Sequence, residues 1–296
     1  MRFLLRRTVK NQVARAEDPV ALRSRSLDSS RLIEKLFASV KVEPTTVNDV
    51  PCEWITPADC DDDRVLVHLH GGGYVFMGLD THRETCCRLA EAARMRVLNV
   101  DYRLAPENPF PAALDDATSC YRWLIDEGYD PAKIAVGGDS AGGGLSLALL
   151  MNARNLGLPL PACCVMISPW TDLSLSGDSM RRNAAADPML SREALERWAG
   201  FYLGKRDRRA PLASPLFGDL SGLPPIMIQV GSAEVLLSDA ERVADKIRET
   251  GGQVSLEVWP GMFHVFHLMA ARVPEGKQVI ARIGEFLLNK TGASHG

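Results

Sequence analysis

Short apolar runs alternate with longer amphipathic runs from about residue 64 onward, and this alternation constrains the fold more than any other feature. The apolar runs are typical of buried β-strands, and the amphipathic runs are typical of α-helices. We predict strands at residues 64–70, 96–103, 133–138, 162–169, 225–231 and 254–260, and helices at 82–95, 110–128, 141–157, 238–252 and 275–290. Nearly continuous apolar strands separated by helices indicate an α/β fold, with a mostly parallel central sheet and helices on both faces.

Two long segments interrupt the alternation, at residues 1–45 and 170–215. Segments of this length inside a compact domain are usually lids or binding elements. We predict that the two form one helical cap, while residues 46–169 and 216–296 form the main domain. In parallel sheets, ligands bind at the carboxyl ends of the strands. We therefore expect the cap to lie over those ends.

Composition excludes several classes of function. The 296 residues carry a net charge of −3, whereas a nucleic-acid-binding protein usually has a strong positive excess. No apolar stretch approaches the ~20 residues needed to cross a bilayer, so we expect neither nucleic-acid binding nor stable membrane insertion. The seven cysteines are odd in number and fit no common disulfide or zinc spacing. A reducing cytoplasm is the simplest location for such a chain.

A serine flanked by glycines lies between the strand at 133–138 and the helix at 141–157. The sequence Gly138-Asp139-Ser140-Ala141-Gly142 matches G-x-S-x-G. This pattern is typical of a sharp strand-to-helix turn that exposes the serine hydroxyl as a nucleophile. The alternative is a passive serine in a glycine-rich turn. A phosphate-binding loop is disfavoured, because no lysine follows and no G-x-G-x-x-G pattern occurs.

A glycine triplet ends the strand at 64–70. Ester cleavage passes through a tetrahedral oxyanion, which is stabilised by backbone N–H groups that already point at it. We predict that Gly71 and Gly72 donate from this loop together with Ala141, and that Gly73 shapes the turn. The alternative is a flexible turn without this role. His70 is expected to orient the loop or to pack in the core.

A serine nucleophile needs a histidine base and a carboxylate that holds the base in place. On sheets of this kind the acid and then the histidine follow the serine in the chain. His264 lies in the loop after the last strand and is preferred over His267 and the near-terminal His295. Glu234 follows the strand at 225–231 directly and is the preferred acid. Asp239 is the alternative acid, although it is also explained as a first-turn helix residue.

Taken together, these motifs resemble the hormone-sensitive-lipase-like branch of the α/β-hydrolase superfamily, also called the family IV bacterial esterases. The resemblance covers about residues 45–290. It rests on HGGGYVFMG at 70–78, DYRLAPE at 101–107, GGDSAGG at 137–143 and SPWTDL at 168–173. It implies an α/β-hydrolase fold with a helical cap, built from the N-terminus and an insertion after the sixth strand. It also implies hydrolysis of carboxylic esters, usually with short acyl chains, without a metal or cofactor.

The sequence departs from the family pattern at the acid. Many members carry aspartate in a D-P-L stretch, where this chain has Glu234-Val235-Leu236. The acid is thereby one methylene longer, which leaves the choice between Glu234 and Asp239 open. Within DYRLAPE, we expect Asp101 and Arg103 to pair and brace the loop behind the site.

We predict a serine hydrolase that cleaves short-to-medium acyl esters through Ser140, His264 and Glu234, with an acyl-enzyme intermediate. Alternatives are an amide or aryl-acetamide hydrolase with the same triad, or a non-catalytic binding protein like the plant gibberellin receptors. Those receptors lack the histidine base. A homodimer that pairs the last strand across a two-fold axis is left open. The candidate substrate-binding residues, for which ordinary packing is the alternative role, are Tyr74, Phe76, Met77, Trp198 and Phe201.

Overall fold

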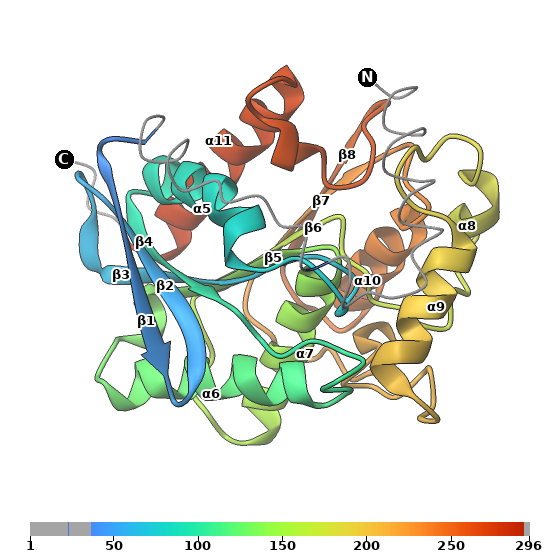
Figure 1. The fold of residues 1–296 in the computed structure, drawn as a ribbon, viewed down its shortest axis with the longest axis horizontal. Helices are drawn as coiled ribbons and strands as arrows, with labels where there is room; N and C mark the ends of the chain where they lie inside the picture. The colour runs from blue at the N-terminus through green and yellow to red at the C-terminus, as the bar shows by residue number, and fades with distance from the viewer. Residues whose placement is uncertain (1–22, 24–36, 293–296) are drawn as a thin grey trace.

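The computed structural model describes residue 23 and residues 37–292, which form an eight-stranded sheet with helices on both sides (Figure 1). The strand order is β1-β2-β4-β3-β5-β6-β7-β8. Strands β3 to β8 pair in parallel, which confirms the predicted mostly parallel sheet. The strands are β1 (Val40–Val47), β2 (Val50–Pro57), β3 (Asp61–Leu69), β4 (Met95–Val100), β5 (Ile134–Asp139), β6 (Cys163–Ile167), β7 (Ile226–Gly231) and β8 (Val254–Trp259).

The central strands are buried over their whole length. Every residue of β5, β6 and β7 is buried, because helices cover both faces of the sheet there. Strand β8 at the edge has no fully buried residue, and its Ser255 and Val258 are exposed. The apolar composition that predicted the parallel strands therefore reflects two-sided burial, as expected for such sheets.

A hairpin of β1 and β2 adds two antiparallel strands to the sheet. Val47 pairs with Val50, and the two turn residues Asn48 and Asp49 have positive φ of 47° and 67°. Asparagine and aspartate tolerate this conformation, which the two-residue hairpin turn requires. The sheet thus includes residues 40–45, and the prediction that assigned them to the cap is wrong.

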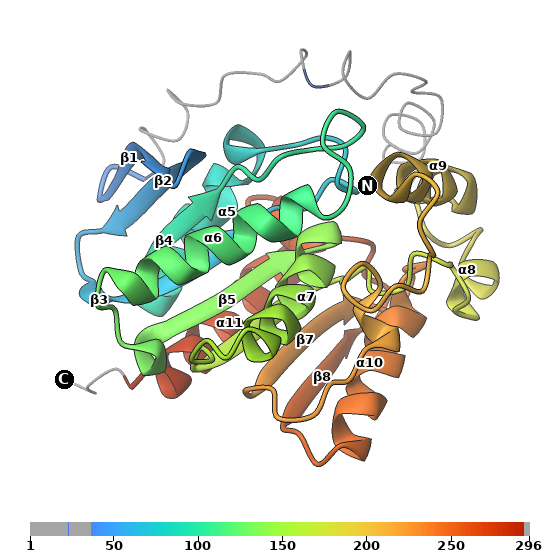
Figure 2. The ribbon, with the colours of Figure 1, turned by 90° about the horizontal axis from the view of Figure 1, so that it is seen from below.

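Two layers of helices cover the sheet (Figures 1 and 2). Helices α5 (Leu79–Ala93) and α11 (Pro274–Lys290) pack against each other on one face. Helices α6 (Ala112–Asp126), α7 (Ala141–Asn155) and α10 (Leu237–Glu249) cover the other face. Within the described ranges there are also three short 3₁₀ helices: η2 (Pro131–Lys133), η3 (Pro215–Phe217) and η4 (Phe266–Met269). Among the described residues, no helix is long and apolar enough to cross a membrane.

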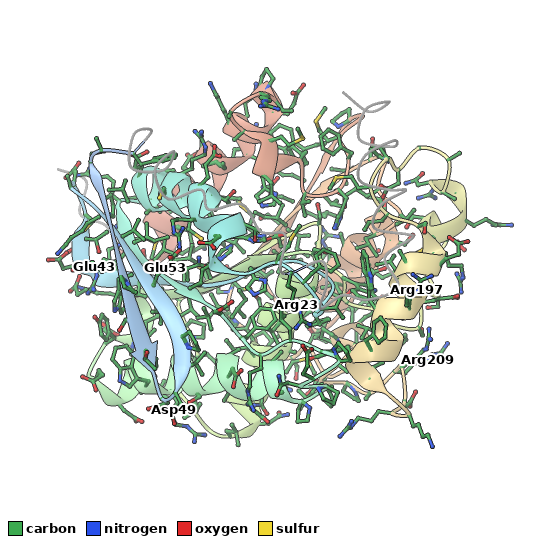
Figure 3. The ribbon with its side chains drawn as sticks, in the orientation of Figure 1. Arg23, Glu43, Asp49, Glu53, Arg197 and Arg209 are labelled. Carbon is green, nitrogen blue, oxygen red and sulfur yellow. The ribbon has the colours of Figure 1, made fainter. Side chains whose placement is uncertain are left out.

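The segment at 170–215 contains α8 (Ser179–Arg182) and α9 (Arg192–Leu203), which lie at one end of the sheet (Figure 2). Figure 3 shows Arg197 on α9 and Arg209 shortly after it, far from Glu43 on β1. The opposite side of α9 is apolar and buries Trp198. The N-terminal part of the predicted cap falls mostly outside the described residues, so its position stays a prediction.

The turn between β5 and α7 is packed tightly against the end of β3. A Cβ atom added at Gly142 would lie 1.9 Å from the carbonyl oxygen of Leu69 and 2.5 Å from that of His70. A Cβ at Gly138 would lie 2.3 Å from the same Leu69 oxygen. These positions therefore require glycine because the backbones of two segments touch there.

We expect Gly142→Ala to destabilise the fold by about 3 kcal/mol, because neither backbone can yield to the added methyl group without displacing a strand. Thermal unfolding of the purified variant measures the loss. Gly200→Ala is the matched control, since a Cβ there meets nothing within 4 Å. Inside helix α9 that change should stabilise slightly, by up to about 1 kcal/mol. Equal melting temperatures for both variants would contradict the account.

Candidate active site

Ser140 lies at the turn between β5 and α7, with φ 53° and ψ −120°. This left-handed backbone is costly for a residue with a side chain, by about 1–3 kcal/mol. Hydrogen bonds hold it: the Ser140 N–H donates to Ile167 O (2.9 Å), and the Ser140 carbonyl accepts from Trp170 N (2.9 Å). The turn places the Ser140 side chain at the carboxyl end of the sheet, on the wall of a cavity. The predicted strand-to-helix elbow is present.

His264 joins Ser140 to Glu234. Its Nε2 lies 2.9 Å from Ser140 Oγ, and its Nδ1 lies 2.9 Å from Glu234 Oε2. All three residues are buried, although Ser140 keeps 8% of its surface exposed. The three side chains come from the loops after β5, β7 and β8, which are distant in sequence. This geometry allows the imidazole to accept the serine proton while its other nitrogen donates to the carboxylate.

The second carboxylate oxygen of Glu234 is also fixed. Oε1 accepts hydrogen bonds from Ser168 Oγ (2.7 Å) and from Gly231 N–H (2.5 Å). Ser168 Oγ in turn accepts from the N–H of Val265, next to the histidine (3.2 Å). Ser168 is not among the predicted site residues, although it begins the SPWTDL motif. Ser168 ties the acid to the histidine loop and so limits the motion of both.

The alternative acid, Asp239, serves the cap segment instead. Its Oδ2 accepts from the N–H groups of Thr171 (2.8 Å) and Asp172 (2.9 Å), where the segment leaves the sheet. Burial and the neighbouring Asp172 raise the pKa of Asp239 to about 7. The alternative base, His267, is buried, and neither ring nitrogen has a hydrogen-bond partner within the described part of the chain. His295 lies outside the described residues.

The glycine loop differs from the prediction in one donor. The N–H of Gly71 points at His82 Nε2, at 3.3 Å, and therefore away from the cavity. The prediction that Gly71 donates to an oxyanion is wrong for this reason. Gly72 and Gly73 line the cavity beside Ser140 instead, both with positive φ (116° and 62°). Gly73 thus shapes the turn, as predicted, and also faces the site.

An apolar cavity with about 440 Å³ of empty space, including its opening to solvent, adjoins Ser140. Three predicted substrate-binding residues, Phe76, Met77 and Trp198, line it. The prediction for Tyr74 and Phe201 is wrong, because neither lines the cavity: Tyr74 is buried in a stack on Tyr202 with ring centroids 3.8 Å apart, and Phe201 packs against the core. The full lining is Gly72, Gly73, Phe76, Met77, Asp139, Ser140, Met189, Leu190, Trp198, His264, Val265 and Leu268.

Neighbouring charges shift the pKa values of His264 and Asp139. Burial alone would lower the pKa of His264, but the hydrogen bond and negative charge of Glu234 outweigh burial and raise it. Burial likewise opposes ionisation of Asp139, yet the adjacent His82 holds the pKa of that carboxyl below its usual range. An imidazole with a raised pKa is a stronger base.

The brace behind the site also differs from the prediction. Arg103 pairs with Asp116 through its guanidinium (2.7–3.0 Å) and its backbone N–H (2.8 Å). Asp101, the predicted partner, lies near His70 Nε2 at 4.0 Å. His70 itself is buried, stacks on Tyr102 at 4.2 Å between centroids, and contacts the Gly71 carbonyl through Nδ1 (2.6 Å). It packs in the core and holds the glycine loop, as expected.

Comparison with known proteins places the chain in a family. A family model described as the alpha/beta hydrolase fold matches residues 66–268. An acetyl-hydrolase of Streptomyces hygroscopicus is 44% identical, covering 88% of this chain and 87% of that protein. An esterase of Acinetobacter venetianus is 37% identical, covering 84% of this chain and 82% of the relative. A crystal structure of an esterase from the bacterial hormone-sensitive lipase family has a TM-score of 0.85 at 45% identity, covering 95% of this chain and 98% of that one.

The chain therefore belongs to the alpha/beta hydrolase family, within its hormone-sensitive-lipase-like esterase branch. The fold and family that the sequence motifs suggested are confirmed.

We expect Glu234→Gln to move the acid limb of the pH–rate profile of kcat/KM to lower pH. Hydrolysis is present above the pKa of His264 and is lost as pH falls through it, and Glu234 raises that pKa. The same change should lower kcat by about 10⁴-fold, since an amide does not stabilise the imidazolium. Asp239→Asn is the matched control and should leave the limb in place. An unmoved limb in Glu234→Gln would exclude Glu234 as the acid.

Proposed function

We propose that this protein is a serine carboxylic-ester hydrolase that acts on short-to-medium acyl esters through an acyl-enzyme. The observation that carries the proposal is the contact of His264 with Ser140 and Glu234 at 2.9 Å each, beside an apolar cavity. The named activities of relatives, an acetyl-hydrolase and an esterase, support the substrate class.

In the first half-reaction, His264 Nε2 accepts the proton of Ser140 as Oγ attacks the ester carbonyl carbon. The carbonyl oxygen becomes an oxyanion near the N–H groups of Gly72 and Gly73 and of Ala141 at the first turn of α7. The start of a helix favours negative charge at this position. Glu234 stabilises the imidazolium, which then protonates the departing alcohol. The acyl group remains bound to Ser140 as an ester.

In the second half-reaction, water takes the place of the alcohol. His264 accepts a proton from the water, whose oxygen attacks the acyl-enzyme carbonyl carbon. The same N–H groups stabilise the second oxyanion. His264 returns the proton to Ser140 Oγ, and the carboxylic acid leaves. No group beyond these side chains and backbone donors is needed for either half-reaction.

The cavity walls favour a small acyl group. Trp198 packs directly on the glycine loop, so that a Cβ atom at Gly73 would lie 2.6 Å from its Cε3 atom. Phe76 meets the same indole edge-on, with centroids 5.0 Å apart. These two rings close the cavity beside Ser140. Apolar contact would bind a short acyl chain, whereas a long chain would have to displace an aromatic ring.

The structure gives less support to the two alternative functions, a non-catalytic binding protein and an amide hydrolase. A non-catalytic binding role does not need the contacts that align His264 with Ser140. An amide hydrolase would use the same triad, and no feature of the cavity favours it. The cytoplasmic location and a homodimer that pairs the edge strand β8 stay predictions.

We expect the purified protein to hydrolyse p-nitrophenyl butyrate much faster than butyranilide, because the anilide has the poorer leaving group and the site offers it no further contact. Spectrophotometric release of nitrophenol and aniline compares the two. Ser140→Ala should abolish nearly all turnover of both, leaving at most about 10³–10⁴-fold acceleration over water. Faster anilide cleavage would favour the amide hydrolase, and full activity of Ser140→Ala would overturn the mechanism.

We expect Trp198→Ala to shift preference towards longer acyl chains. Removing the indole opens the cavity, and each accommodated methylene is worth about 1–3 kcal/mol in kcat/KM. The ratio of kcat/KM for p-nitrophenyl octanoate over acetate should therefore rise by about tenfold or more. Phe201→Ala, on the same helix but outside the cavity, is the control and should leave the ratio unchanged. An unchanged ratio in Trp198→Ala would mean that the indole does not limit the acyl chain.

A further inference from the structure

A second histidine, His82 on α5, contacts both parts of the proposed site from behind. Its Nε2 lies 3.3 Å from the N atom of Gly71, which begins the glycine loop. The same nitrogen lies 3.1 Å from Oδ1 of Asp139, which directly precedes Ser140 in the chain. One imidazole nitrogen is therefore in contact with the oxyanion loop on one side and the nucleophile elbow on the other.

We propose that His82 and Asp139 form a positioning pair, which sets the spacing between the glycine loop and Ser140 during ester hydrolysis. Neither residue is assigned a chemical step. The inference rests on the proposed function, because it concerns the placement of the Gly72 and Gly73 donors relative to the attacking oxygen.

The imidazole of His82 is held rigidly enough for this role. Its Nδ1 lies 2.9 Å from Oγ1 of Thr81, and that hydroxyl donates to the carbonyl of Gly78 (2.8 Å). His82 is fully buried, and Asp139 is 1% exposed. Because both ring nitrogens have close partners, the ring cannot rotate without losing a buried contact. When the imidazole is protonated, its Nε2–H donates to Asp139 Oδ1 and the contact is an ion pair; when it is neutral with the proton on Nδ1, Nε2 accepts from the Gly71 N–H instead.

The carboxylate of Asp139 also fits closely against the loop backbone. A Cβ atom at Gly71 would lie 2.3 Å from Asp139 Oδ2, so the loop passes directly over the carboxylate. Gly72 and Gly73 follow immediately and line the cavity. A change in the Asp139–His82 contact would therefore displace the N–H groups that face the oxyanion. A misplacement of about 1 Å at a reacting group costs about 10²-fold in rate.

A neighbouring buried histidine provides a matched control. His68 on β3 lies 5.7 Å from His82 between ring centroids, but its Nδ1 contacts Asn99 Oδ1 (3.0 Å). Asn99 in turn donates to Glu53 (2.9 Å), which Figure 3 labels on β2. This chain of contacts leads away from Ser140 and towards Arg83. Loss of the His68 ring thus removes the buried hydrogen bond to Asn99 and leaves the contacts of His82 Nε2 with Gly71 and Asp139 in place.

The test compares kcat and KM for p-nitrophenyl butyrate in His82→Ala, His82→Gln, Asp139→Asn and His68→Ala. We expect His82→Ala to lower kcat by about 10²-fold with little change in KM, since the donors act mainly on the transition state. His82→Gln should recover part of this loss, because its amide can again contact Gly71 and Asp139. Asp139→Asn keeps the size of the side chain and should lower kcat by about tenfold. His68→Ala should lower the melting temperature but keep kcat within about twofold.

The effects of changing His82 and Asp139 on kcat are also expected to be non-additive. The double variant His82→Gln with Asp139→Asn should lose less kcat than the product of the two single losses, as residues in contact usually do. Folded variants of His82 and Asp139 with unchanged kcat would overturn the inference. So would equal kcat losses in His82→Ala and His68→Ala, which indicate general destabilisation. If the unaltered protein itself fails to hydrolyse the ester, the proposed function fails instead, which separates the two conclusions.

Discussion

The close approach of the β5–α7 turn to the end of β3 is the contact on which the site depends. Gly138 and Gly142 let the Leu69 carbonyl come nearer than any side chain would allow. Between them, Ser140 is held at φ 53°, a conformation that a residue with a side chain adopts only where its surroundings enforce it. The same packing brings the glycine loop after β3 beside the serine. One steric constraint therefore positions both the nucleophile and the proposed oxyanion donors.

The order of the parallel strands brings the other residues of the site to the same edge of the sheet. Strands β3, β5, β6, β7 and β8 are neighbours in the sheet, and each is followed by a residue or loop of the site. The glycine loop follows β3, and the sequence then adds Ser140, Ser168, Glu234 and His264 after the next four strands. Because parallel strands end at one edge, short loops after these strands bring together groups that are far apart in the chain. The segment at 170–215 adds Trp198 and Leu190 to the wall of the cavity at this edge.

Part of the fold and of the site could be predicted from the sequence alone. The G-x-S-x-G turn follows local steric rules, and the order of strands along the chain favours His264 and Glu234, although the sequence alone leaves Asp239 as an alternative acid. Directions of individual groups could not be predicted in this way. The N–H of Gly71 points at His82 because of the turn that follows it, and the conformation of that turn cannot be predicted from the sequence pattern. Tyr74 likewise turns into the core, with positive φ of 64°, instead of facing the substrate.

Two further errors concern the hairpin and the partner of Arg103. The hairpin of β1 and β2 was missed because Pro44 and Pro51 interrupt its alternation, although Asn48-Asp49 carried a turn signal. The partner of Arg103 is Asp116, thirteen residues away on α6, and tertiary packing alone selects it over Asp101. The order of elements along the chain and local steric rules are thus readable from the sequence, whereas the direction of a single N–H group or the partner of a single side chain requires the fold.

The central claim is that Ser140 is a nucleophile activated by His264. Reaction with a fluorophosphonate, followed by mass spectrometry of the digested protein, tests it most directly. The account predicts one phosphonyl adduct on the peptide that contains Ser140, and strongly slowed labelling in His264→Ala. An unlabelled Ser140 in the folded protein, or equal labelling rates with and without the imidazole, would contradict it.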